Sequence, residues 1–254
     1  MHTEEEFTQL EQEERQLTDE AIAIILLILA TVKGNLKKEL RNFYSKYGKD
    51  GVVTYAEARK WISEQEHSRR LTALLIYLSG EFEGASSDIK ITFEAMLKSV
   101  INKEVEFFDV EIDNCDKLIE TKWGNDDSNW LSRIDEDIAL WIVCIANDLK
   151  RAMLQHKPLD SVLKQLDKRF KSIESIVTTL GLSESTAVGS LARRKIFGEL
   201  GITKYQFYTK PDERRCETCG AMHGLVFPIS AYEVGVTASP IHPRCRCWEV
   251  PIKD

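Results

Sequence analysis

The stretch PIHPRCRCWEVP occupies residues 240–251 and carries an imidazole and two thiols among three prolines. These groups belong to His242, Cys245 and Cys247. In extended backbone, side chains two residues apart point to the same side, so Cys245 and Cys247 can approach one ion together. Sulfur and imidazole donors favour zinc over magnesium or calcium.

A matching pair of thiols precedes this stretch. Cys216 and Cys219 have the spacing Cys-x2-Cys, and twenty-two residues separate Cys219 from His242. Two thiolates on one tight turn, completed by a second ligand pair some twenty residues later, are typical of tetrahedral structural zinc. Five donors compete for four positions. The expected set is Cys216, Cys219 and Cys245 with either His242 or Cys247, and of these two we favour His242.

The sequence changes in character from about residue 203. Five of the six prolines and four of the six cysteines follow residue 210, and aromatic and β-branched residues occur in short runs. About fifty residues bury too little apolar surface to be stable alone, and a structural zinc supplies on the order of 10–16 kcal/mol of apparent binding energy. We therefore expect a small zinc-stapled α+β module with a core of its own, which metal removal unfolds while the helices persist.

The rest of the chain has the periodicity of helices, with apolar residues at steps of three or four. A polar stretch, residues 63–70, interrupts the second helix, and residues 80–88 read as a loop. Gly181 and Gly201 are expected to cap the last two helices. The predicted helices cover about 17–47, 54–78, 97–119, 134–153, a segment ending at Leu180, and 183–200. The predicted fold is mainly α: a long-helix body over residues 1–180, with an acidic tail over 1–16, and the zinc-binding module over 181–254.

Charge is concentrated at the start of the chain. Residues 1–20 hold eight acidic residues and one arginine, a net charge of −7 that equals the net charge of the whole protein. The remainder is neutral, which argues against a globally basic, phosphate-seeking surface. We expect the acidic segment to be a solvated, frayed end; the alternative is a docking tail for a basic partner.

The run AIAIILLILA, residues 21–30, is too short to span a membrane even when extended to Val32. It follows an acidic segment, whereas a signal peptide has a basic one, so we expect no membrane and a reducing compartment in which disulfides are disfavoured. So apolar a helix predicts burial on more than one side. We expect a partner to complete this surface, or self-association.

The segments KPDERRCETCGAMHGLVF (210–227) and SPIHPRCRCWEVP (239–251) resemble the C-terminal signature of the tailed-phage minor head proteins, the Mu protein F-like or head-morphogenesis family. The segment SESTAVGSLARRKIFGELGI, residues 183–202, is similar to the helix that precedes the motif in that family. The resemblance covers about the last seventy-five residues, and residues 1–175 carry no matching motif. The matching positions are Asp212, Arg214, Cys216, Cys219, Gly224, Pro240, His242, Pro243, Cys245, Arg246 and Cys247.

This resemblance implies a non-enzymatic structural protein of a phage or prophage particle. Its expected place is inside the head at the portal vertex, after a period in the host cytoplasm. Its expected partners are the portal protein and capsid or scaffold proteins, and its expected role lies in head assembly and in DNA packaging and ejection. The zinc is expected to be structural.

Two other functions compete with this one. Recognised nucleotide-binding and hydrolase motifs are absent, but a treble-clef-type nuclease would use charged groups such as His223, Arg244 and Asp212 around a metal that keeps an exchangeable water. Five protein donors favour a closed site instead. A zinc-dependent nucleic-acid-binding protein would need a local basic patch and would bind with steep salt dependence. The residues for that patch are Arg193, Arg194, Lys195, Lys204, Lys210, Arg214, Arg215, Arg244 and Arg246.

Overall fold

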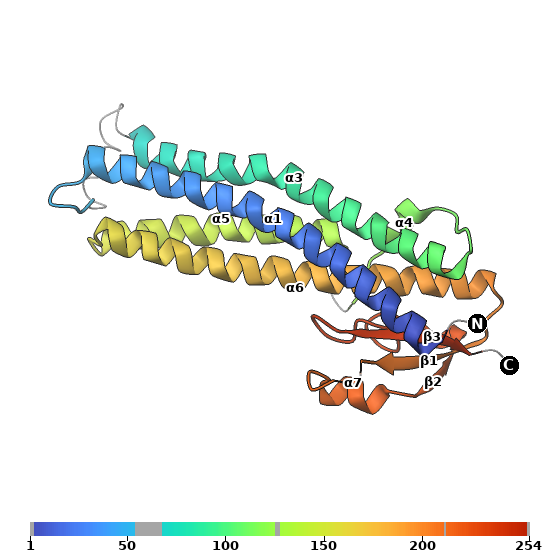
Figure 1. Cartoon of the computed structure of the whole chain (residues 1–254). Helices are drawn as coiled ribbons and strands as arrows, with labels where there is room; N and C mark the ends of the chain where they lie inside the picture. The colour runs from blue at the N-terminus through green and yellow to red at the C-terminus, as the bar shows by residue number, and fades with distance from the viewer. Residues whose placement is uncertain (1–2, 54–67, 125–127, 211, 253–254) are drawn as a thin grey trace. The chain divides into compact units, whose positions relative to one another are not determined.

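The computed structural model of the chain describes residues 3–53, 68–124, 128–210 and 212–252 (Figure 1). Most of these residues are helical, and a three-stranded antiparallel sheet follows the helices, which confirms the predicted fold class. The long helices are α1 (Glu4–Tyr47), α3 (Ser68–Phe108), α5 (Trp130–Leu154) and α6 (Leu159–Glu199). The short ones are α4 (Cys115–Ile119), α7 (Glu217–Met222) and the 3-10 turn η1 (Ile229–Ala231).

The sheet has the order β2-β1-β3, so the first strand in sequence lies in the middle. The strands are β1 (Lys204–Thr209), β2 (Val226–Pro228) and β3 (Cys247–Ile252). Lys204 pairs with Ile252 at one end of the β1–β3 ladder and Thr209 pairs with Cys247 at the other. This register fixes where the last cysteine lies relative to β1.

The described residues fall into two compact units that share the long helices. The first unit contains Met1–Ala23, Ile91–Arg133 and Val177–Asp254, and the second contains Ile24–Lys90 and Ile134–Ile176. These bounds differ from the predicted division after residue 180. Whether residues 181–254 fold on their own therefore stays a prediction.

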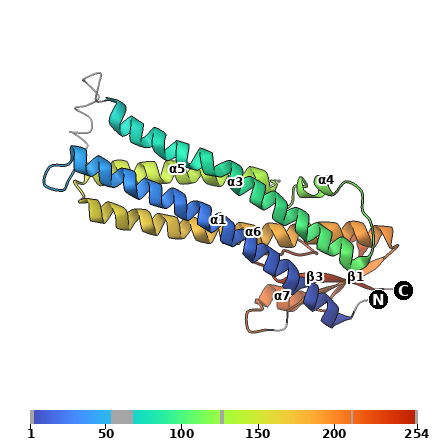
Figure 2. The same ribbon diagram turned by 45° about the horizontal axis from the view of Figure 1, so that its top comes forward.

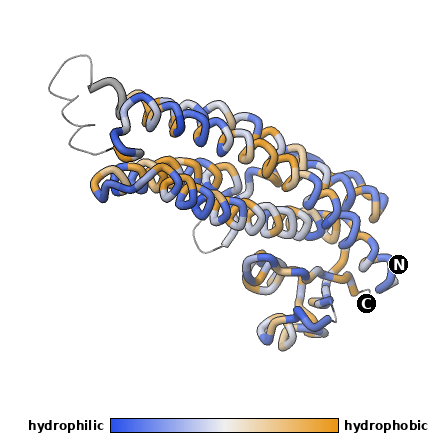
Figure 3. Tube along the Cα trace, turned by 60° about the vertical axis from the view of Figure 1, so that its left-hand side comes forward, coloured by the Kyte–Doolittle hydropathy of each residue, from blue (hydrophilic) through white to orange (hydrophobic). Residues whose placement is uncertain are grey.

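The long elements that the structure describes in the second unit are helices. Phe82 of α3 stacks on Phe170 of α6 with 6.0 Å between ring centroids, and Trp141 of α5 packs against the same phenylalanine of α3. Both hydrophilic and hydrophobic residues occur along each long helix (Figure 3), and the buried residues recur at steps of three or four, which places them on one stripe. The apolar run of α1 is only partly covered: Leu29 is fully buried, whereas Leu27 is 69% exposed.

The first unit has a core that the sheet shares with a helix. Phe197 of α6 packs edge-on against Tyr232, and Tyr232 lies 4.6 Å from Tyr205 of β1 between ring centroids. Phe108, at the end of α3, packs against the same cluster. The module expected over residues 181–254 includes this part of α6, but Phe108 of α3 lies outside it, so the core is not confined to the predicted module.

Helix boundaries differ from the prediction in four places. The acidic segment is not frayed but forms the first turns of α1, with Thr3 capping the helix by accepting a hydrogen bond from the backbone of Glu6. Residues 80–88 are helical within α3, and the chain breaks after Phe108 rather than continuing to residue 119. The predicted helix start at 54–67 lies outside the described residues.

The fourth difference is Gly181, which lies inside α6 rather than at its end. A Cβ atom at this position would lie 2.9 Å from Cγ1 of Ile22, so the glycine allows α1 and α6 to approach closely. Gly201 has the positive φ of +66° that a helix C-terminus favours, and α6 ends two residues before it, as predicted.

Candidate metal centre

Cys216 and Cys219 are presented by the start of α7. Cys216 is the N-cap residue, and its Sγ accepts a hydrogen bond from the backbone N–H of Cys219 at 3.3 Å. Two bonds tie this turn to β1: Gly224 N–H donates to the Phe207 carbonyl, and Phe207 N–H donates to the Leu225 carbonyl. Gly224 has a φ of +81°, which favours glycine at the position where the chain turns back into β2.

The second group of donors comes from the loop 239–247, which we call the metal-binding loop. His242 and Cys245 lie on one turn, because the Cys245 N–H donates to the His242 carbonyl at 3.1 Å. Ser183 of α6 supports this turn by accepting a hydrogen bond from the backbone of Arg244. Cys247 begins β3. The helix that the resemblance places before the motif thus carries the loop.

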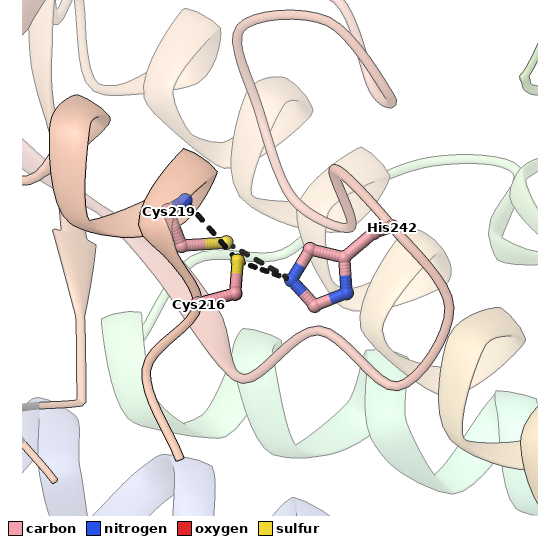
Figure 4. A group of neighbouring side chains, drawn as sticks. All are labelled: Cys216, Cys219 and His242. Atoms are coloured by element: carbon pink, nitrogen blue, oxygen red, sulfur yellow. Dashed lines mark hydrogen bonds between the residues drawn. The ribbon is translucent and has the colours of Figure 1, made fainter. Parts of the chain in front are cut away.

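The five predicted donors lie in two overlapping groups. Cys216, Cys219 and His242 form one, and Cys219, Cys245 and Cys247 form the other, with the donor atoms of each group within 4.8 Å of one another. Figure 4 shows the first group, in which the imidazole points at both thiols. Cys219 belongs to both groups and stands at their centre.

The distances suit a tetrahedral metal. Zinc–sulfur bonds of about 2.3 Å at tetrahedral angles place two sulfur atoms about 3.8 Å apart. The Sγ atoms of Cys219 and Cys245 lie 3.8 Å apart. Nε2 of His242 lies 3.2 Å from Sγ of Cys216 and 3.1 Å from Sγ of Cys219, a few tenths of an ångström short of the corresponding separation. The group can therefore hold a metal ion with little rearrangement.

His242 is oriented for ligation. Its Nδ1 lies 2.9 Å from the Pro243 carbonyl, which has no hydrogen to give, so Nδ1–H donates and Nε2 keeps its lone pair. Nε2 is the atom that faces the two thiols. Such a bond from the second ring nitrogen is the usual way in which proteins fix a metal-binding imidazole.

The buried thiols cannot all ionise without a cation. Cys219, Cys245 and Cys247 are buried, with exposed fractions of 3%, 1% and 6%. Hydrogen bonds from Cys219 and Cys247 lower the pKa of Cys245, and hydrogen bonding to Cys245 together with burial raises the pKa of both donors. A bound cation would replace these protons and stabilise three thiolates at once.

A salt bridge connects the segment of Cys245 and Cys247 to the segment that precedes Cys216. Arg246, between Cys245 and Cys247, bonds Asp212 through both terminal nitrogens, with Nη2 at 2.6 Å from Oδ1. This guanidinium lowers the pKa of Asp212 to about 2. Oδ1 also accepts the backbone N–H of Arg214 at 2.9 Å. The acidic and basic residues of the motif thus brace the metal ligands.

The residues from Asp212 to Cys247 therefore form two ligand turns joined by a salt bridge, and α6 supports the second turn. Residues 144–250 match the family described as Phage Mu protein F like protein. This match confirms the resemblance and extends it upstream, because it begins within α5 rather than at α6. Neither the curated proteins nor the solved structures contain a significant match to the chain.

His223 lies apart from both groups of donors in the Mu F-like segment. It caps α7, its Nδ1 accepts the backbone N–H of Thr209 at 3.2 Å, and its ring packs edge-on against Tyr208. His223 is thus a turn residue at the end of α7. Sequence reasoning missed Glu249, which is fully buried in β3. The signal that could have identified it is the position of a glutamate between two apolar residues, Trp248 and Val250, in a segment expected to be a strand.

Several members of the predicted basic patch are engaged within the protein. Arg193 is buried among carboxylates, Lys210 pairs with Glu11 at 3.2 Å, and Arg246 holds Asp212. Lys195 donates to the Asp113 carbonyl and Arg244 to the Thr179 hydroxyl. The patch is thus partly neutralised.

Proposed function

We propose that this chain is a minor head protein of a tailed phage or prophage, and that it acts at the portal vertex in head assembly and in DNA packaging and ejection. The observation that carries the proposal is the match of residues 144–250 to the Mu F-like family, which includes every matching position of the motif from Asp212 to Cys247. The virion, at the inner face of the portal vertex, is the corresponding location. None of the helices in the described ranges combines the length and hydropathy that a membrane crossing requires.

The metal in this proposal is a structural zinc. Thiolate and imidazole donors select zinc among common cellular cations, and donors held by two turns and a strand suit a closed site. Cys216, Cys219 and Cys245 are the expected ligands, with His242 as the fourth because its Nε2 contacts two of the thiols. Cys247, the fifth donor, is the alternative. A closed site leaves no position for a catalytic water, which supports a non-enzymatic role.

The portal is proposed as the partner because the second unit keeps apolar side chains exposed. Leu27 of α1 is 69% exposed, and Leu140 and Val143 of α5 are each 54% exposed. Each pair formed with a neighbour on the same helix, Ile24 with Leu27 and Leu140 with Val143, is spaced by three residues and so shares a face. Surfaces of this kind are buried in assemblies.

The direct test is co-expression with the portal protein of the same phage. The two should purify together, and moderate salt should not separate them because the contact is apolar. Quantitative mass spectrometry of purified heads should find the chain in few copies. A chain that ignores the portal and binds DNA with steep salt dependence would support the nucleic-acid-binding function instead.

A further inference from the structure

Four ionisable side chains, none of them a candidate metal donor, meet inside the first unit. Arg193 of α6 is 4% exposed and contacts carboxylates from three other elements. Its Nη2 lies 3.3 Å from Glu14 of α1 and bonds Glu104 of α3, and its Nη1 lies 3.3 Å from Glu249 of β3. Charges are seldom buried unless they are paired, so this cluster joins α1, α3, α6 and β3 at one point.

Glu249 connects this cluster to the metal-binding loop. Its Oε1 accepts the backbone N–H of Ser239 at 2.6 Å, at the start of the loop. Its Oε2 accepts the hydroxyls of Ser190 at 2.8 Å and Tyr232 at 3.0 Å. Glu249 itself follows Cys247 by two residues in β3. One buried carboxylate thus holds both ends of the loop that carries His242 and Cys245.

The start of α1 lies over this arrangement, as both ribbon views show (Figures 1 and 2). Glu11 pairs with Lys210, six residues before Cys216, and Phe7 packs edge-on against Phe107 at 5.0 Å between centroids. A small cavity of about 30 Å³ separates the helix from the strand. Its lining includes Glu11 and Glu14 from α1 and Cys245, Cys247 and Trp248 from the metal-bearing segment.

From these contacts we propose that the first turns of α1, residues 4–20, lock the metal-binding loop in its ligating geometry, acting through Arg193 and Glu249. The acidic N-terminal segment is thus a positioning element of a metal site about two hundred residues away in sequence. The Mu F-like segment, residues 144–250, lacks two members of the cluster, Glu14 and Glu104. The inference rests on the proposed zinc centre but not on the proposed role in the phage head.

Two variants of the full chain test the lock from different sides. Glu249→Gln keeps the shape of the Glu249 side chain and removes its charge. The double variant Phe7→Ala with Leu10→Ala removes two buried side chains that hold α1 down, and it touches neither a charge nor a metal donor. The matched control is Leu36→Ala with Leu40→Ala, which removes two buried leucines from α1 in the second unit.

The first readout is the rate at which zinc passes to a chromogenic chelator. Both test variants should release zinc about tenfold faster or more, the range found when outer partners of metal ligands are removed. The control should stay within about twofold of the parent chain, since it leaves the cluster intact. Unchanged release from the Phe7/Leu10 variant would overturn the lock, even if Glu249→Gln accelerates release.

The second readout is hydrogen exchange of the backbone amides of residues 239–249, which requires no metal count. Undocking α1 should lower their protection, and the control should not. If the parent protein carries no zinc, the proposed zinc centre is refuted. The hydrogen-exchange data would still decide whether α1 holds the metal-binding loop. Equal protection in the Phe7/Leu10 variant and the parent would overturn the proposal by this route as well.

Discussion

Arg246 holds Asp212 with both of its terminal guanidinium nitrogens, and so joins the segment before the first cysteine pair to the segment between the last two cysteines. Lysine presents one point charge and cannot make this fork. Arg246→Lys should therefore speed zinc release to a chelator, whereas Arg214→Lys, which leaves the fork intact, should not. Equal release rates for the two variants would show that the brace does not act on the metal site.

The choice between His242 and Cys247 as fourth ligand is the second prediction. His242→Ala should lower the bound zinc and Cys247→Ser should not, because Nε2 of His242 contacts two of the thiols. Metal content is measured by elemental analysis of each variant after dialysis. Cys216→Ser and Cys219→Ser serve as positive controls that should both lose the metal. If Cys247→Ser loses zinc and His242→Ala keeps it, Cys247 is the fourth ligand and His242 is not.

The third prediction concerns pH. Burial first, and then the neighbouring Glu104 carboxylate, raise the pKa of Glu14 well above its usual range, although Arg193 opposes this and Glu11 adds to it. Because the folded-state pKa is raised, the folded protein binds this proton more tightly than the unfolded chain does. The contribution of the bound proton to the free energy of unfolding is therefore complete below the unfolded pKa near 4.5, and it is lost as the pH rises through the folded-state pKa.

Glu14→Gln mimics the protonated acid and should remove this loss. Between the two pKa values, the parent should lose up to about 1.4 kcal/mol per pH unit relative to Glu14→Gln. The difference in unfolding free energy between the two zinc-saturated proteins, measured by denaturant titration from pH 5 to 9, isolates Glu14. Glu5→Gln, an exposed position on the same helix, is the control. Parallel pH profiles for parent and Glu14→Gln would contradict the prediction.

The fourth prediction concerns the close approach of α1 and α6, which alanine substitutions at two glycines of α6 can test. Gly181→Ala should destabilise by about 1–3 kcal/mol relative to Gly198→Ala, because its Cβ would meet Ile22. No atom lies within 4 Å of the corresponding Cβ at Gly198, where alanine should stabilise by about 0.5–1 kcal/mol. Denaturant unfolding measures both. Two alanines of equal effect would mean that Ile22 moves aside without cost.

Portal docking through the second unit is the fifth prediction. Leu27→Glu combined with Leu140→Glu should abolish co-purification with the portal protein, since charge on an apolar contact is costly to bury. Leu200→Glu, on an exposed leucine of the first unit, should not. Retained co-purification in the double variant would move the contact to another surface.

Sequence reasoning reached the parts of the fold that local chemistry determines. The Cys-x2-Cys turn, the C-terminal cap at Gly201 and the core stripe of α5 follow from spacing and backbone preference. It failed where distant segments decide the outcome. Gly181 has the signature of a helix end, but packing against Ile22 keeps it inside α6. The acidic start of α1 suggests a solvated tail, but Lys103, Arg193 and Lys210 give its acids partners.

The candidate site shows the same division. Spacing alone selected the five candidate donors that the structure brings together, because zinc ligands often occur in pairs on tight turns. Spacing could not identify Arg193 or Glu249, whose partners come from four elements scattered over the chain. Nor could it assign the fourth ligand, since both alternatives lie beside Cys219.

The central claim is that the C-terminal ligand turns hold one structural zinc, and native mass spectrometry of the full chain, purified under reducing conditions without chelator, tests it most directly. The measured mass should equal that of the chain plus one zinc ion, less one proton for each cysteine that binds the metal. The mass of the Cys216→Ser variant should be that of the metal-free chain. A parent protein whose mass shows no metal and whose thiols are all reduced would contradict the claim.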